Sequence, residues 1–169
     1  MIIYLIRHGE KDGNNFDSNL TSNGEAQIKK LAHTLEPEKI KKIYASFHPR
    51  SIQTAKIISE SVGAPIEQIN ISEFEKYIFF TDENNWSQDQ AKQIREIDVL
   101  IRKIVKEEED VLLAFHAGVN RAILSNVLDI PLKKTIHFSQ DVACLNILEY
   151  KEIYGEKMWC IRLLNSTTH

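Results

Sequence analysis

The chain has 169 residues, a formal net charge of −3 at pH 7, and 43% hydrophobic and 27% charged residues. This length and composition are ordinary for one soluble domain, and the small negative charge argues against a nucleic-acid partner, because no excess of Lys and Arg is available to neutralise a phosphate backbone. No run of about 18 apolar residues occurs, so we expect no membrane partner and a cytoplasmic location.

The N-terminal part of the chain predicts a strand, a loop and a helix. Residues 2–6 form a continuous apolar run that predicts a strand buried on both faces, and a polar loop follows over residues 9–19. Ser22 and Glu25 have the spacing of a capping box, which predicts the start of a helix that Pro37 ends.

The middle of the chain continues the same alternation. A second strand is predicted at residues 43–45, and Pro49 then begins a helix that Gly63 ends. Residues 66–71 could form a third strand. The spacing of the isoleucines after it predicts a long amphipathic helix over residues 86–110.

The C-terminal part completes the predicted sheet. Residues 111–115 indicate another buried strand, and residues 118–128 a helix. Residues 142–150 and 157–164 are typical of two strands joined by a loop. We therefore expect residues 1–169 to form a single α/β domain, a three-layer sandwich in which a mostly parallel sheet carries helices on both faces.

Polar side chains follow the ends of four predicted strands. They are Arg7, His8, Arg50, Glu73 and His116. Because ligands in open α/β folds bind beyond the carboxyl ends of the strands, these side chains would meet at one rim, where the last helix would aim the N–H groups of Ala117 and Gly118 at an anion. The combination favours a phosphate pocket and phosphoryl chemistry. His48 and His137 could line the rim, but exposed loop positions would explain them equally well.

Four blocks and the tail of the chain resemble the histidine phosphatase superfamily, also called phosphoglycerate mutase-like. Arg7-His8-Gly9-Glu10 looks like the family signature, and Asn14 lies where the opening motif places its Asn. Residues 20–27, 45–55 and 116–122 resemble the later blocks in the same order, and residues 164–169 resemble the family's tail. Because the resemblance spans essentially the whole chain, it implies a phosphoglycerate mutase-like fold.

The resemblance also implies a role for each matching residue. His8 would attack phosphorus and give a phosphohistidine that water hydrolyses, which suits an imidazole with an ordinary pKa of about 6.5. Arg7 and Arg50 would bind the equatorial oxygens, and His116 would donate a hydrogen bond to the transition state. The reaction would need no metal and no other cofactor. The further phosphate-binding residues would be Asn14 and Ala117.

A general acid must protonate the leaving alcohol and later activate water. In much of the family this acid is a Glu in an L-x-E segment after the third strand, and Ile71-Ser72-Glu73 is the nearest match. The family's usual continuation is missing, and residues 74–78 stand in its place. Glu75 therefore remains a rival to Glu73 for the role of the acid.

The segment before the second histidine distinguishes branches of the family. It is short here, so we expect a small cap around residues 74–90, and a short cap favours hydrolysis over mutase chemistry, which needs a closed site. Residues 116–124 are most similar to the α-ribazole phosphatase-like branch, which makes α-ribazole 5′-phosphate the first substrate to consider. The alternatives are a phosphoglycerate or sugar-phosphate phosphatase or mutase, a protein-phosphohistidine phosphatase, and a non-catalytic phosphate-binding module. The sequence leaves the oligomeric state open.

Overall fold

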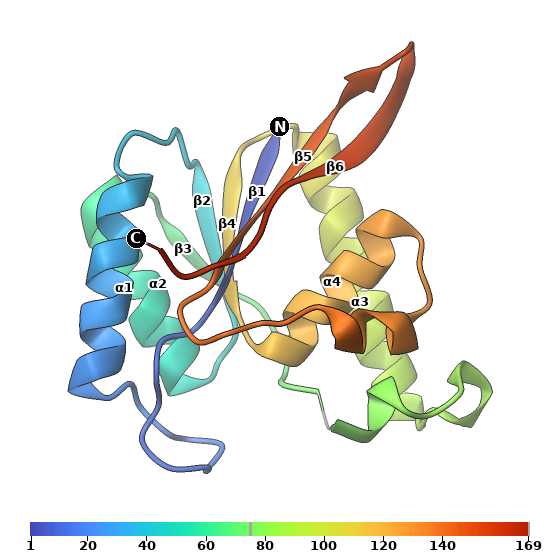
Figure 1. The fold of residues 1–169 in the computed structure, drawn as a ribbon, viewed down its shortest axis with the longest axis horizontal. Helices are drawn as coiled ribbons and strands as arrows, with labels where there is room; N and C mark the ends of the chain where they lie inside the picture. The colour runs from blue at the N-terminus through green and yellow to red at the C-terminus, as the bar shows by residue number, and fades with distance from the viewer. Residues whose placement is uncertain (75, 169) are drawn as a thin grey trace.

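The computed structural model of the protein describes residues 1–74 and 76–168. Strands and helices alternate along the chain, as the sequence pattern predicted (Figure 1). In chain order the elements are β1 (Ile2–Arg7), α1 (Ser22–Leu35), β2 (Lys42–Ala45), α2 (Pro49–Val62), β3 (Ile66–Gln68), the 3₁₀ helices η1 (Lys76–Phe79) and η2 (Glu83–Asn85), α3 (Gln88–Glu107), β4 (Val111–Phe115), α4 (Ala117–Leu128), the 3₁₀ helix η3 (Leu132–His137), β5 (Leu145–Ile153) and β6 (Glu156–Ser166).

The six strands form one mixed sheet in the order β3-β2-β4-β1-β5-β6. The neighbours β1 and β4, β2 and β4, and β2 and β3 run parallel, whereas β5 is antiparallel to both β1 and β6. Helices α1 and α2 cover one face of the sheet, and α3 and α4 cover the other (Figure 1). The predicted three-layer α/β sandwich with a mostly parallel sheet is therefore confirmed.

The alternation of side chains along β1 divides the core into two layers. Ile3 and Leu5 belong to the hydrophobic cluster on the side of α3 and α4, and Tyr4 and Ile6 belong to the cluster on the side of α1 and α2. This central strand is thus buried on both faces, as its unbroken apolar run predicted. The residues that follow β1 are held at the middle of the sheet edge.

The first helix is capped by a different residue from the one that the sequence pattern predicted. Thr21, rather than Ser22, is the N-cap, and its hydroxyl accepts a hydrogen bond from the backbone nitrogen of Gly24 at 2.9 Å. The same hydroxyl donates to Oε1 of Glu10 at 2.7 Å. The prediction of a capping box at Ser22 is wrong because this contact with the preceding loop selects Thr21.

β3 is shorter than predicted, and β5 begins and ends three residues later than predicted. β3 ends at Gln68 because its parallel neighbour β2 ends at Ala45, so the chain beyond has no ladder to join within the described residues. β5 begins at Leu145 because Ala143 has a φ of 56°, which an extended strand does not adopt. Between β3 and α3, where a small cap was expected, the described residues form η1 and η2.

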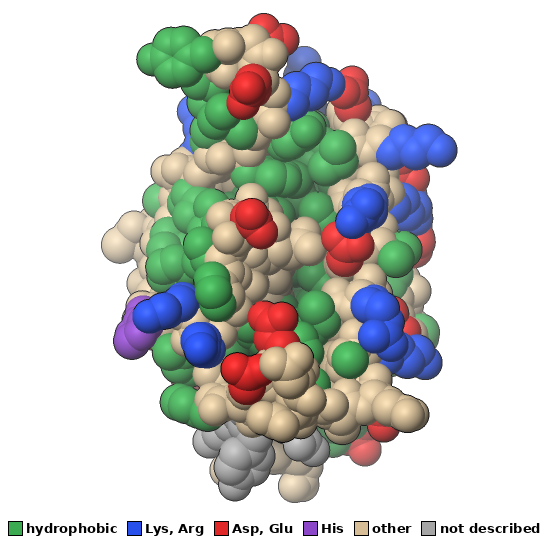
Figure 2. All heavy atoms as spheres, turned by 90° about the vertical axis from the view of Figure 1, so that its right-hand side faces the viewer, with side chains coloured by type: hydrophobic (Ala, Val, Ile, Leu, Met, Phe, Trp, Pro, Cys, Tyr) green, Lys and Arg blue, Asp and Glu red, His purple; other side chains and the backbone are tan. Residues whose placement is uncertain are grey.

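The surface carries mixed charges and one projecting hairpin. Figure 2 shows acidic and basic side chains interspersed over the face to which α3 and α4 belong. The hairpin of β5 and β6 extends beyond the rest of the sheet, and Tyr154 at its turn is fully exposed (Figure 1). Within the part of the chain that the structure describes, no helix is long and apolar enough to cross a membrane.

Candidate active site

The carboxyl ends of β1, β4 and β2 lie at one edge of the sheet because these neighbouring strands run parallel. His8 follows β1, and its backbone N–H donates to the carbonyl of Phe115, the last residue of β4, at 3.0 Å. This bond extends the ladder by one residue and brings His8 beside His116, with 5.2 Å between the ring centroids. The structure thus brings the two histidines of the sequence motifs together.

The imidazole of His8 is buried and held in one orientation. The residue is 1% exposed, and its Nδ1 lies 2.8 Å from the carbonyl oxygen of Gly9. Because a carbonyl oxygen only accepts, Nδ1 carries the proton and Nε2 keeps the lone pair. The pKa of His8 is lowered to about 3, mainly by burial and also by the charges of Arg7 and Arg50. The ring is therefore neutral at ordinary pH, as a nucleophile must be.

Two glycines allow the loop after β1 to lie directly against the start of α1. A Cβ on Gly9 would lie 2.5 Å from the carbonyl oxygen of Gly24, and a Cβ on Gly24 would lie 2.1 Å from that of Glu10. Neither position accepts a larger side chain without a shift of the backbone. Thr21 adds a 2.9 Å hydrogen bond from its backbone nitrogen to the carbonyl of Glu10. The carbonyl of Gly9 that orients His8 is thereby fixed by α1.

His116 is the N-cap residue of α4 and is fully buried. Its Nε2 lies 2.8 Å from the hydroxyl oxygen of Ser46, which directly follows β2. Among the described residues its Nδ1 has no hydrogen-bond partner. Burial lowers the pKa of His116 well below its usual value, and the nearby His8 and Arg50 add to this effect. A buried ring nitrogen of this kind is a group that a ligand can satisfy.

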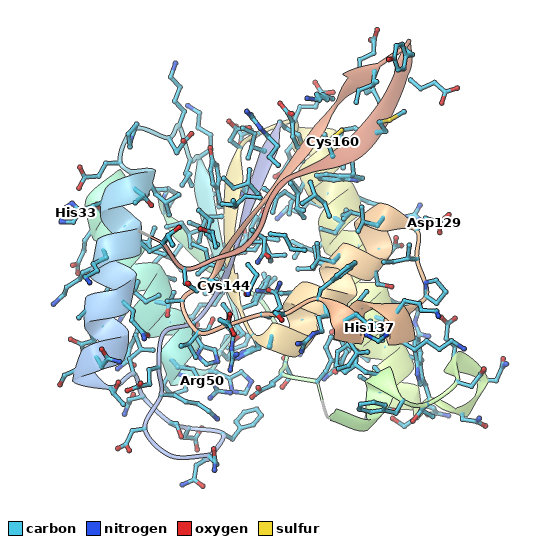
Figure 3. The ribbon with its side chains drawn as sticks, viewed as in Figure 1. His33, Arg50, Asp129, His137, Cys144 and Cys160 are labelled. Atoms are coloured by element: carbon cyan, nitrogen blue, oxygen red, sulfur yellow. The ribbon has the colours of Figure 1, made fainter. Side chains whose placement is uncertain are left out.

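The guanidinium of Arg50 is fully buried at the start of α2, beside the loop that follows β1 (Figure 3). Its Nη1 donates to the carbonyl of Phe16 at 2.6 Å, and its Nη2 pairs with Oε2 of Glu73 at 2.6 Å. Its Nε is a buried donor that has no partner in the described part of the chain. An anion that bound Arg50 would compete with the carboxylate of Glu73 for the same cation.

Arg7 is anchored by a buried network of amide side chains. Its Nη1 donates to the backbone carbonyl of Gln140 at 2.5 Å, and its Nε is a buried donor without a partner among the described residues. Oε1 of Gln140 accepts from Asn120 and from Asn146, both at 3.0 Å. Asn146 also donates to the carbonyl of Leu5 in β1 at 3.0 Å. Sequence reasoning missed this network, because neither Gln140 nor Asn146 belongs to a motif.

Two cavities meet at Glu73 and Phe74. The larger has a volume of about 850 Å³, and the smaller a volume of about 410 Å³. Asn14 lines the larger cavity, whereas Arg7 and Ala117 line the smaller one. The phosphate-binding residues that the sequence predicted therefore include residues on both sides of Glu73. Asn14 is the most exposed of them.

Of the two glutamates that the sequence predicted as candidates for the general acid, the structure describes only Glu73. Glu73 follows β3 in irregular backbone, and 39% of its side chain is exposed while it pairs with buried Arg50. A carboxyl group at this place can reach both solvent and the two cavities. Glu75, the alternative, lies outside the described residues.

His48 lies inside the site and not in an exposed loop. It is the N-cap residue of α2 and is 2% exposed. Its ring centroid lies 3.8 Å from that of Phe16 and 4.6 Å from that of His116. His137, by contrast, is exposed at the end of η3 (Figure 3). The sequence signal for His48 was its position close to Arg50 in the same block.

The donors at this edge suit an anion. They comprise two guanidiniums, buried ring nitrogens and the N-terminus of α4, where free backbone N–H groups favour negative charge. Among residues 1–74 and 76–168, no three His, Cys, Asp or Glu side chains are grouped as the ligands of a metal ion would be. We therefore assign no residue to a metal or to another cofactor.

Sequence comparison finds one matching family model and curated relatives that match only part of the chain. Residues 3–73 and 81–165 match the model of the histidine phosphatase superfamily (branch 1). Over 71 residues the chain is 35% identical to a protein named "Probable phosphoglycerate mutase GpmB" from Serratia proteamaculans (strain 568), and this match covers 38% of the chain and 33% of that protein. The chain therefore matches about a third of the length of this curated relative.

Solved structures share the fold over nearly the whole chain. The α-ribazole phosphatase from Shigella flexneri has a TM-score of 0.79 at 20% identity, covering 99% of this chain and 97% of that one. A mycobacterial glucosyl-3-phosphoglycerate phosphatase has a TM-score of 0.79 at 16% identity, covering 98% of each chain. At these identities the likeness shows the fold, and it confirms the phosphoglycerate mutase-like architecture.

Proposed function

The chain belongs to the histidine phosphatase superfamily, and on this premise we propose that it hydrolyses phosphate monoesters through a phosphohistidine formed at His8. The observation that carries the proposal is the buried, neutral ring of His8, whose Nδ1 is tied to the carbonyl of Gly9 at 2.8 Å. Its Nε2 keeps the lone pair, the ring of His116 lies beside it, and the charges of Arg7 and Arg50 act on it. A neutral nucleophile among cationic and hydrogen-bonding donors suits an anionic phosphoryl group.

Binding of the phosphoryl group uses donors that the protein itself leaves unpaired. Arg7 and Arg50 would bind the non-bridging oxygens, and each has a buried Nε without a partner among the described residues. His116 would donate through a ring nitrogen. Asn14 from the loop and the backbone N–H of Ala117 would add neutral donors. These groups would stabilise the charge that spreads over the oxygens in the transition state.

In the first step, Nε2 of His8 attacks phosphorus. The P–N bond forms while the bond between phosphorus and the alcohol oxygen breaks, and the electron pair of that bond stays on the oxygen. Glu73, which takes up a proton from solvent when the substrate binds, donates this proton to the oxygen, so the product leaves as a neutral alcohol. The proton on Nδ1 remains on the ring, where it keeps the hydrogen bond to Gly9.

In the second step, Glu73 acts as a base. Its carboxylate takes a proton from water while the water oxygen attacks phosphorus, and the electron pair of the P–N bond returns to Nε2 of His8. Inorganic phosphate leaves, and both residues regain their starting states. One water is consumed for each ester that is cleaved.

The substrate that we propose is a small phosphorylated metabolite, and α-ribazole 5′-phosphate is the first candidate. Support comes from the fold of the Shigella flexneri enzyme and from the larger cavity beside Glu73, which is lined by Phe16 and by polar side chains. Such a lining suits a ring and a sugar. A phosphoglycerate is the second candidate. A relative named as a probable phosphoglycerate mutase matches part of the chain in sequence, and the cation of Lys11, which would suit a carboxylate, lines the same cavity. Either metabolite would be met in the cytoplasm.

Hydrolysis of p-nitrophenyl phosphate in excess chelator tests the proposal. We expect turnover by the intact protein and a loss of about 10³-fold or more in His8→Ala, because the nucleophile is gone. Quenched reactions of the intact protein should carry acid-labile phosphate on the peptide that contains His8. Equal turnover by both proteins would refute the role of His8. A panel of α-ribazole 5′-phosphate, 3-phosphoglycerate and a phosphohistidine peptide, compared by kcat/KM, would then decide among the substrates.

A further inference from the structure

The ring of His48 joins separate segments of the site. Its Nδ1 lies 3.3 Å from the carbonyl oxygen of Phe16, in the loop after β1, and its Nε2 lies 3.4 Å from the backbone nitrogen of Glu73. The hydroxyl oxygen of Ser72 lies 3.4 Å from the same Nε2. One buried side chain therefore contacts both the loop after β1 and the segment of the candidate acid, while its ring meets that of His116.

These contacts define the protonation of the ring. The carbonyl oxygen of Phe16 can only accept a hydrogen bond, and the backbone N–H of Glu73 can only donate one. Nδ1 of His48 therefore carries the proton, and Nε2 keeps the lone pair that accepts from Glu73. An imidazolium has no such lone pair, so it cannot make both bonds. Burial and the charge of Arg50 lower the pKa of His48, which favours the neutral ring.

The backbone that carries Glu73 belongs to no regular element. β3 ends at Gln68 and η1 begins at Lys76, so Glu73 is not held by a strand ladder or a helix. Its carboxylate is held by Nη2 of Arg50 at 2.6 Å. A phosphoryl group would compete for that cation, whereas the hydrogen bond from the backbone N–H of Glu73 to His48 does not compete with the substrate.

We propose that His48 is a positioning residue, which holds the backbone of Glu73 in place while Glu73 transfers its proton to the leaving group. The inference rests on the proposed function, because it takes Glu73 as the acid. In the first step, a displaced acid slows only reactions whose leaving group needs a proton. Since a positioned acid contributes about 10²- to 10⁴-fold to such reactions, a partial displacement has a measurable effect.

Two substitutions separate the two hydrogen bonds of His48. In His48→Gln, the amide oxygen lies about where Nε2 was and can accept from Glu73. In His48→Asn, the amide nitrogen lies about where Nδ1 was and can donate to Phe16, but the side chain is too short to reach Glu73. Both variants remove the buried ring and remain neutral, so each is the structural control for the other.

The quantity to measure is the ratio of kcat/KM for glycerol 3-phosphate to kcat/KM for p-nitrophenyl phosphate, because kcat/KM reports the first step and excludes the hydrolysis of the phosphohistidine that both substrates share. The first leaving group needs a proton, and the second departs as a stable anion. We expect His48→Asn to lower this ratio by about tenfold or more, His48→Gln to lower it by less than about threefold, and Glu73→Gln to lower it more than either. Thermal melting of each variant checks that it is folded at the assay temperature.

The other outcomes overturn the inference, and they differ from a failure of the proposed function. An equal loss of kcat/KM on both substrates in His48→Asn, or the same ratio in His48→Asn and His48→Gln, would mean that His48 only supports the fold. An unchanged ratio in Glu73→Gln would remove Glu73 as the acid, and the role of His48 with it. A complete lack of turnover by the intact protein would refute the proposed function itself.

Discussion

Nη2 of Arg50 lies 2.6 Å from Oε2 of Glu73, although the first side chain is fully buried and the second is 39% exposed. The pair compensates a cation that would be costly to bury alone. It also joins the arginine that we assign to phosphate binding with the carboxyl group that we assign to proton transfer. When a phosphoryl group takes the place of the carboxylate on Arg50, Glu73 becomes free to act as the acid.

This competition predicts the effect of Glu73→Gln on phosphate binding. We expect the variant to bind inorganic phosphate about three- to tenfold more tightly than the intact protein, because Arg50 has lost its anionic competitor. Titration calorimetry measures the two dissociation constants. Glu67→Gln is the matched control, since it removes the same charge from a carboxylate that pairs with Lys42 and Lys103 away from the site. Unchanged or weaker phosphate binding in Glu73→Gln would contradict the competition.

The fold class was predictable because it follows from local patterns. Apolar runs gave the strands, helical spacing gave the helices, and parallel strands bring the residues after their carboxyl ends to one edge. The N-cap of α1 was mispredicted because Thr21 and Ser22 are both good caps, and the choice depends on Glu10 in the preceding loop. His48 was left ambiguous because its partners Phe16 and Glu73 lie far away along the chain, and Asn146 was missed because its partner in β1, Leu5, is distant as well.

The N-cap of α1 offers a direct comparison of two adjacent residues. Thr21→Ala should lower the free energy of unfolding by about 1–2 kcal/mol, because it removes the hydrogen bonds to Gly24 and Glu10. Ser22→Ala should change it by less than about 0.5 kcal/mol, although the sequence pattern favoured this residue as the cap. Urea unfolding of both variants measures the difference. Equal costs would show that Thr21 is not the cap that matters.

The buried histidines predict that stability falls in acid. The pKa of His8 is about 3 in the folded protein and about 6.5 in the unfolded chain, so between these values the unfolded chain binds one more proton. Stability from this group is complete above about pH 6.5 and falls by about 1.4 kcal/mol per pH unit below it, until the folded pKa is reached. His48 and His116, whose pKa values are also lowered, steepen the slope.

Urea unfolding between about pH 5 and pH 8 measures this slope. His8→Gln should reduce the slope of stability against pH by the contribution of one titrating group, about 1.4 kcal/mol per pH unit, because glutamine does not titrate. His137→Gln is the matched control for the substitution itself, since His137 is exposed at the end of η3. A slope that is the same in His8→Gln and in the intact protein would mean that His8 titrates in the folded state as it does in the unfolded chain.

The amide network behind Arg7 predicts that one buried substitution weakens both the fold and phosphate binding. Asn146→Ala removes the buried hydrogen bonds that this side chain makes to the carbonyl of Leu5 and to the side chain of Gln140, so we expect the free energy of unfolding to fall by about 2–4 kcal/mol. Because Gln140 holds Nη1 of Arg7 through its backbone carbonyl at 2.5 Å, we also expect inorganic phosphate to bind about threefold or more weakly.

Urea unfolding and phosphate titration of the same Asn146→Ala sample separate these two effects. Asn126→Ala, which removes an exposed amide that bonds to Asp98, is the control and should change neither quantity appreciably. If Asn146→Ala loses stability while phosphate binds as tightly as before, the backbone of Gln140 keeps its place without the network. The network would then serve the junction between β1 and β5, and the position of Arg7 would depend on the strand end alone.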